Sequence, residues 1–148
     1  MARIDTVIIG GGQAGLAMSR CLSDLGIEHV VLERGKVAQR WRSQSWDSLH
    51  LLTPNWMTRL PGFEYDGHDG DGYMSARELI GFLERYAVSS AAPVVTDTEV
   101  QSVERSINGF RVATNRGIWW ASFVVVATGY CQRPAVPVHR LSDGHADP

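Results

Sequence analysis

The spacing of apolar residues at the start of the chain predicts a strand, a helix and a second strand. Residues 4–9 are a short β-branched run that ends at glycine, which is typical of a strand buried in a parallel sheet. Across residues 13–25 apolar side chains recur at steps of three and four, and Gly26 follows as a C-terminal stop. Residues 29–32 return to strand chemistry. The three segments together predict the right-handed crossover unit of a parallel α/β sheet.

Residues 35–73 show neither the helical nor the strand period, and they are rich in Trp, Gly, Asp and Pro. A loop of this length inside a compact domain usually contributes to a site. The number of large apolar side chains in it argues against disorder. We therefore expect a long ordered loop that is connected with function.

Ser75 and Glu78 have the spacing of a capping box, which predicts that a second helix begins here. Its inner face is expected to consist of Leu79, Phe82, Leu83 and Tyr86. Residues 94–96 then favour a third strand of the sheet.

Three short alternating segments follow, at residues 99–105, 110–114 and 118–121. Asn-Gly and Asn-Arg-Gly sequences separate them, so they predict a β-meander. Residues 123–127 form a continuous apolar run that predicts a separate central parallel strand, ending at Thr128-Gly129 before a proline-rich exit.

The composition fits one domain whose partners are small molecules or proteins. The chain has 148 residues, 44% of them apolar, and a net charge of -2, which gives no electrostatic basis for binding nucleic acid or an anionic membrane. Glycines interrupt the apolar run near the N-terminus, which argues against a signal peptide, and no apolar stretch is long enough to span a bilayer. We expect a soluble, cytoplasmic protein.

The cysteines and histidines give no sign of a metal site. Cys21 and Cys131 form no Cys-x-x-Cys pair, so they can build neither a zinc site nor a disulfide relay, and both are expected to be small buried groups. His50 lies in the long loop, where it could face a cofactor ring. The other histidines are expected at the surface: His29, His68, His139 and His145. Trp119 and Trp120 are expected to pack within the meander.

Gly10, Gly12 and Gly15 form a G-x-G-x-x-G pattern between the first strand and the first helix. The first glycine permits a tight turn, the second lets a diphosphate approach the backbone, and the third lets helix and strand pack closely. The N–H groups at the start of the helix, around Gln13 and Ala14, would face the diphosphate. The pattern therefore predicts a dinucleotide site.

Glu33 ends the second strand, about 20 positions beyond Gly10, where an acid reaches the ribose hydroxyls of a bound adenosine. A carboxylate here would repel a 2′-phosphate. The site is therefore expected to prefer FAD or NAD over NADP.

Taken together, these motifs resemble the flavin-containing monooxygenase superfamily. Besides the glycines and Glu33-Arg34, the family's W-R and D-S-L-x-L-x-T-P sequences match Trp41-Arg42 and residues 47–54, and its A-T-G matches residues 127–129. The resemblance implies an α/β, Rossmann-like FAD-binding domain with a parallel sheet and a three-stranded β-meander. It favours FAD, with NADPH in a complete enzyme. The cofactor contacts expected on this basis are Gly10, Gly12, Gln13, Ala14, Gly15, Glu33, Arg34, Trp41, Leu49, Val100, Ala127, Thr128 and Gly129.

The sequence also departs from the family's pattern. Leu52 stands where an asparagine is usual, and Gln39-Arg40 replace paired glycines before the loop tryptophan. No second G-x-G-x-x-G and no F-x-G-x-x-x-H follow Gly129. We therefore expect residues 1–148 to be the N-terminal FAD-binding portion, incomplete at its C-terminus, without the NADPH-binding domain. A partner chain or a homo-oligomer could supply the missing parts.

Three functions remain open, and no catalytic residue is assigned. The resemblance favours a monooxygenase that uses NADPH and oxygenates a small organic substrate. The alternatives are a flavin-dependent reductase or dehydrogenase, and a non-catalytic nucleotide-binding module that needs a partner.

Overall fold

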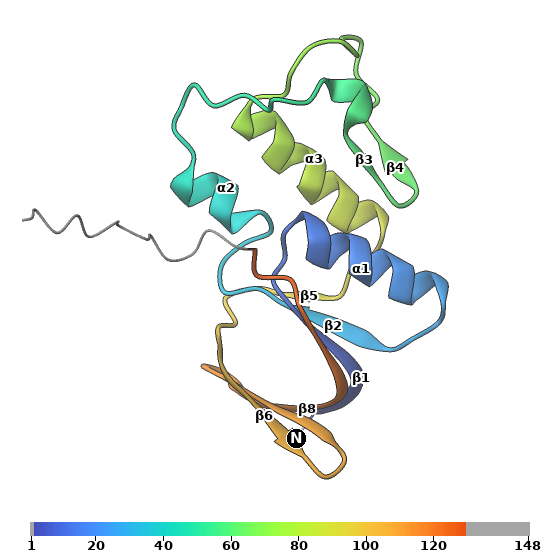
Figure 1. Ribbon diagram of the computed structural model, residues 1–148, viewed down its shortest axis with the longest axis vertical. Helices are drawn as coiled ribbons and strands as arrows, with labels where there is room; N and C mark the ends of the chain where they lie inside the picture. The colour runs from blue at the N-terminus through green and yellow to red at the C-terminus, as the bar shows by residue number, and fades with distance from the viewer. Residues whose placement is uncertain (1, 130–148) are drawn as a thin grey trace, which may run out of the picture.

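A computed structural model describes residues 2–129 (Figure 1). The main sheet has the strand order β5-β2-β1-β8-β7-β6, and a two-stranded hairpin lies apart from it. The strands are β1 (Ala2–Ile9), β2 (His29–Leu32), β3 (Arg59–Leu60), β4 (Phe63–Glu64), β5 (Val94–Val95), β6 (Val100–Ser106), β7 (Gly109–Thr114) and β8 (Gly117–Val126). The helices are α1 (Gln13–Asp24), α2 (Gln39–Gln44), the 3-10 turn η1 (Asn55–Met57) and α3 (Ala76–Ser89).

The predicted strand–helix–strand unit is confirmed. β1 pairs in parallel with β2, with Val7 opposite Val30, and β2 pairs in parallel with β5. β1 is the central strand, and its Val7 and Ile8 are completely buried. This explains why its sequence is a continuous apolar run rather than an alternating one.

The predicted division of the last two strands is wrong, because they are one strand. The first half of β8, residues 117–121, pairs antiparallel with β7, and residues 119–126 pair in parallel with β1. Ser122 lies between the two apolar segments, but its backbone is extended and continues the strand. β8 therefore makes the meander and the parallel strands one continuous sheet.

This sheet curls, so that the meander covers one face of the parallel strands. Val7, Val30 and Leu32 of the parallel strands form one apolar cluster with Val112 and Ala121 of the meander, although β2 and β7 are not neighbours in the sheet. Trp119 packs against the same cluster, as the sequence predicted. Figure 1 shows the meander strands below the parallel strands and the helices above them.

The helices cover the other face. The second core cluster joins Leu16 of α1 to the inner face of α3, formed by Leu79, Phe82, Leu83 and Tyr86. Ser75 caps α3 as predicted: its hydroxyl accepts from the backbone N–H of Glu78 at 3.3 Å, and its own N–H donates to the Glu78 carboxylate at 2.7 Å. The core therefore has two layers, one on each side of the parallel strands.

The expectation of an irregular loop at residues 35–73 is only partly right. This segment contains α2, η1 and the β3–β4 hairpin, all of which are very short. Elements of two to six residues are too short to show a period, and neighbouring parts of the structure stabilise them. α2, for example, packs beside α3, and the ion pair between Arg42 and Glu84 links them.

Two further expectations about α1 and its surroundings are wrong. Cys21 is exposed, because α1 packs through Gly15, Leu16 and Ser19 rather than through its apolar stripe. His29 is buried, with its Nε2 2.8 Å from the Ser19 hydroxyl and its Nδ1 2.8 Å from the Ile27 carbonyl. The expectations for Cys131, His139 and His145 lie outside the described residues.

The capping box gives a first prediction. Ser75→Ala should lower the free energy of unfolding by about 1 kcal/mol, since it removes the acceptor for an N–H at the start of α3. The Ser75 hydroxyl and N–H also donate to the Glu78 carboxylate and lower its pKa, so the stabilisation from these two bonds is present near neutral pH and is lost as the pH falls through the lowered pKa. Urea unfolding at pH 7 and at low pH measures both effects. Ser89→Ala at the other end of α3 is the control, and an equal loss in both variants would contradict the prediction.

Candidate cofactor-binding site

Two of the three motif glycines are required by the fold itself. Gly10 has φ +112°, and a Cβ there would stand 2.5 Å from the carbonyl oxygen of Ala127. A Cβ on Gly15 would overlap the carbonyl oxygen of Gly10. These glycines therefore let the turn lie against β8 and let α1 lie against β1.

Gly12 is different, because nothing in the described structure needs it to be glycine. Its φ of -91° and ψ of -170° are open to any residue, and no atom lies within 4 Å of the position of a Cβ. It is the N-cap of α1 without a side-chain cap, and the first turn has no acidic residue. The start of α1 thus presents backbone N–H groups and a positive dipole end to an open space.

Glu33 holds the glycine turn from the opposite side. Its side chain is buried, and its carboxylate accepts from the N–H of Gly11 at 2.7 Å and from the N–H of Gly35 at 3.0 Å. Each carboxylate oxygen keeps a further lone pair for a hydroxyl donor. Glu33 is therefore oriented before any ligand arrives.

A cavity of about 760 Å³ opens beside the turn. This volume is within the usual range for a cofactor pocket. All of the expected contact residues line the cavity except Gly15, which lies beneath the turn against Gly10. The structure therefore brings together side chains from the turn, the end of β2, α2, the start of β6 and the end of β8, and their role as cofactor contacts remains a prediction.

Sequence reasoning missed several lining residues. They are Ile9, Leu32, Ala38, Gln39, Arg40, Gln44, Ser45, Thr98 and Glu99. Ala38 takes the left-handed conformation, with φ 60°, and its N–H donates to the carbonyl of Gly11 at 3.1 Å. An alanine gives no sequence signal for that conformation. Gln39 and Arg40 stand where the family's pattern has glycines, but that difference alone does not predict a contact with the cavity.

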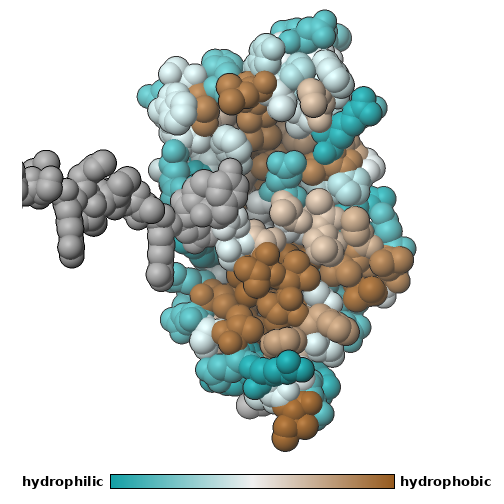
Figure 2. All heavy atoms as spheres, in the orientation of Figure 1, coloured by the Kyte–Doolittle hydropathy of each residue, from teal (hydrophilic) through white to brown (hydrophobic). Residues whose placement is uncertain are grey.

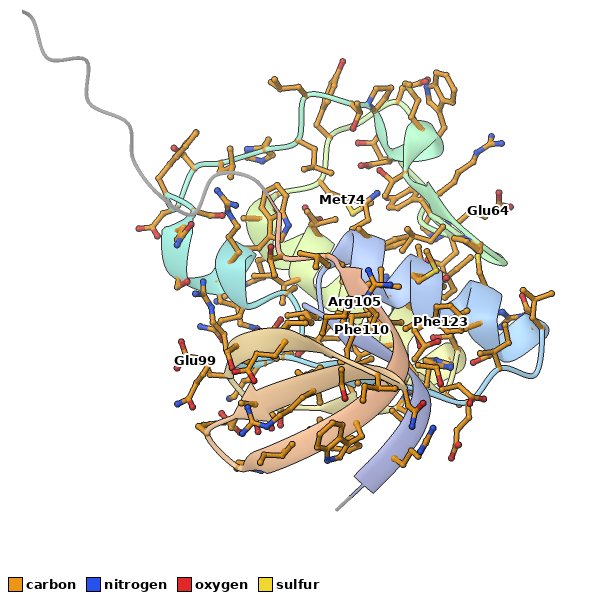
Figure 3. All side chains as sticks on the ribbon, turned by 60° about the horizontal axis from the view of Figure 1, so that its bottom comes forward. Glu64, Met74, Glu99, Arg105, Phe110 and Phe123 are labelled. Carbon is orange, nitrogen blue, oxygen red and sulfur yellow. The ribbon has the colours of Figure 1, made fainter. Side chains whose placement is uncertain are left out.

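The ionisable side chains around the cavity are two acids and two arginines, namely Glu33, Glu99, Arg34 and Arg40. Figure 3 shows Glu99 beside the first residues of β6, at the border of the sheet. His50 is exposed and is not among the lining residues; its Nδ1 lies 3.0 Å from the Ser48 carbonyl. Within residues 2–129 no group of three or more histidine, cysteine or acidic side chains could hold a metal ion.

An uncapped helix start that faces a buried acid across a glycine turn defines a dinucleotide-binding α/β domain of the Rossmann type. In the described part of the chain, no helix is long and apolar enough to cross a membrane.

Comparison with known proteins agrees with this class. The family model described as pyridine nucleotide-disulphide oxidoreductase matches residues 7–145, and the chain belongs to this family. Its relatives place it in the flavin-containing monooxygenase superfamily.

Two curated relatives illustrate the similarity. An uncharacterized CzcO-like oxidoreductase of Geobacillus kaustophilus is 38% identical over 95% of this chain and 40% of its own. A probable indole-3-pyruvate monooxygenase of Arabidopsis thaliana, YUCCA1, is 35% identical over 88% of this chain and 32% of its own. The chain thus spans two fifths or less of the length of these relatives.

Solved structures show the same fold. A flavin-containing monooxygenase from Stenotrophomonas maltophilia has a TM-score of 0.78 at 32% identity, over 86% of this chain and 39% of its own. A bacillithiol disulfide reductase from Staphylococcus aureus has a TM-score of 0.80 at 19% identity, over 88% of this chain and 39% of its own. The second similarity concerns the fold alone.

The different surroundings of the glycines give a second prediction. Gly15→Ala should lower the free energy of unfolding by at least about 3 kcal/mol, because its Cβ would overlap the carbonyl of Gly10. Gly12→Ala should change it by less than about 1 kcal/mol, because its backbone is unstrained and the space is open. Urea denaturation without added nucleotide measures both values. Similar losses in the two variants would show that Gly12 has a structural role.

Proposed function

We propose that this chain binds FAD, as the FAD-binding domain of a flavin-dependent oxidoreductase. The observation that carries the proposal is the open, uncapped start of α1 at Gly12, opposite the buried carboxylate of Glu33 in one cavity. The first feature suits an anionic diphosphate, and the second suits a ribose hydroxyl that donates. Residues 1–148 are proposed to belong to this domain.

The fit to FAD follows from the order of groups around the cavity. The diphosphate would lie over Gly12 and the N–H groups of Gln13 and Ala14, and the adenosine ribose would lie on Glu33. The adenine would then lie toward Arg34 and Val100. The flavin part of FAD would lie toward Trp41, Leu49 and residues 127–129, since all of these residues line the same cavity. The space that a Cβ at Gly12 would fill is therefore the space that the diphosphate needs.

Two considerations favour FAD over the other dinucleotides. Glu33 would repel the 2′-phosphate of NADP, because both groups are anionic. A meander that continues into the central strand β8 is expected in FAD domains, whereas successive strands of simple NAD domains are joined mainly by helices. The 32% identical Stenotrophomonas structure, whose title names a flavin-containing monooxygenase, supports the same choice.

Bound flavin would accept and pass on electrons; the chain's own residues bind and orient it. Glu33 fixes the adenosine end, and the turn fixes the diphosphate. Trp41 and Leu49 supply apolar surface that excludes water from one side of the cavity. No described residue is assigned a proton-transfer role.

The whole protein is proposed to be an NADPH-dependent monooxygenase that acts on a small organic substrate. The names of the Arabidopsis and Stenotrophomonas relatives support this choice over a reductase. The reductase with the same fold is only 19% identical and carries no weight for the activity. A second polypeptide or a second copy of the chain is proposed to cover exposed apolar side chains, among which Leu52 is 96% and Phe123 is 66% exposed.

Gly12→Val is the sharpest test of FAD binding. The valine side chain would occupy the diphosphate position without straining the backbone, so FAD binding should be lost while the fold is kept. Flavin fluorescence titration measures binding, and far-UV circular dichroism measures folding. Gly70→Val is the control, because Gly70 also has open space around it and lies outside the cavity. Undiminished FAD binding by a folded Gly12→Val variant would exclude the proposed site.

The 148-residue chain alone, supplied with FAD, should show no coupled NADPH-dependent oxygenation. Hydride transfer needs the nicotinamide held at about 3 to 3.5 Å from the flavin, which requires a second dinucleotide site. This sequence has only one G-x-G-x-x-G. NADPH oxidation can be followed at 340 nm while products from amines, sulfides and ketones are measured. Efficient product formation would show that the chain builds a nicotinamide site by itself.

A further inference from the structure

Arg40 stands out among the cavity residues because it is a cation carried by α2, whose start is tied to the glycine turn. It is the second residue of α2, and its guanidinium Nη1 lies 3.4 Å from the point where a Cβ of Gly129 would stand. Gly129 is two residues after Ala127 in the chain. The carbonyl oxygen of Ala127 packs against Gly10 of the glycine turn. The guanidinium therefore lies close to the segment that follows β8.

The position of Arg40 is fixed by the way α2 is anchored. The N–H of Ala38 donates to the carbonyl of Gly11 at 3.1 Å, which ties the start of α2 to the turn. Trp41 packs against the core cluster of α1 and α3, and Arg42 pairs with Glu84 of α3. Consecutive residues of α2 are thus directed to different neighbours, and Arg40 is the one whose charge faces the cavity.

The charges around the cavity show what this cation can do. The carboxylate of Glu33 already accepts two backbone N–H groups, and Arg34 follows it at the adenosine end of the cavity. The diphosphate of a dinucleotide brings two negative charges to the start of α1, which offers only partial positive charge from backbone groups. A guanidinium in the same cavity would neutralise part of the charge and donate to phosphate oxygens in a fork geometry.

We propose that Arg40 is a diphosphate-binding residue, which adds a side-chain donor from α2 to the cofactor site. The inference rests on the proposed FAD site and adds a specific contact to it. Arg40 takes the place of a glycine in the family's pattern, so this side-chain contact is a property of this chain rather than of the shared glycine turn.

The experiment measures FAD affinity for the full chain and for three variants by fluorescence titration, at several salt concentrations. Arg40→Gln should raise the Kd for FAD at least tenfold, because a charge-assisted hydrogen bond is lost. Arg40→Lys should recover part of the affinity by keeping the charge. Arg111→Gln is the matched control; it removes an exposed ion pair of the meander, outside the cavity, and should change the Kd by less than about threefold. The salt dependence of the Kd should be weaker in Arg40→Gln than in the unchanged chain.

Competition experiments separate a diphosphate contact from a general loosening of α2. ADP should displace FAD less effectively from Arg40→Gln, whereas adenosine should compete equally well with both proteins. Equal losses for ADP and adenosine, or an unchanged Kd for FAD, would overturn the assignment of Arg40 while leaving the FAD site intact. If the unchanged chain binds no FAD at all, the proposed function itself has failed, and the inference fails with it.

Discussion

The cavity depends on the buried carboxylate of Glu33, which joins the glycine turn to the end of β2. The carboxylate accepts from Gly11 on one side and Gly35 on the other, and the N–H of Gly10 donates to the carbonyl of Leu32 at 2.9 Å. A buried charge is tolerated only where such donors satisfy it, so the turn and the acid require one another. The shape of the site is therefore set by the protein's own hydrogen bonds.

A consequence is that Glu33 has a structural role in addition to the binding role proposed for it. Removing its carboxylate would leave the N–H of Gly11 without its acceptor, in addition to removing the proposed ribose contact. Gly12 does not have this ambiguity, because nothing in the described structure packs against it. For the same reason, we expect substitutions at Gly12 to change ligand binding, whereas substitutions at Gly10 and Gly15 should lower the stability of the fold.

The molecule also exposes apolar surface that its own core does not use. Figure 2 shows hydrophobic surface gathered in the lower half of that view. Large exposed apolar side chains of the described residues include Phe123 and Val126 of β8, Met18 and Leu25 of α1, and Trp46, Leu52 and Trp56 of the 35–73 segment. Figure 3 shows Phe123 and Phe110 close together in projection on the sheet. Surface of this kind is usual where further polypeptide packs.

The sequence by itself determined the parallel crossover unit, the cap at Ser75, the fold class and most of the cavity's lining. These features depend on local signals: a β-branched run, a capping box, and glycines at fixed offsets from an acid. Tertiary structure decided the rest. It fused the predicted strands around Ser122 into β8, exposed Cys21, buried His29 against Ser19, and brought Ala38 and Arg40 to the cavity. No local pattern encodes these outcomes, because each depends on which distant element a residue meets when the sheet curls and α2 docks against α3.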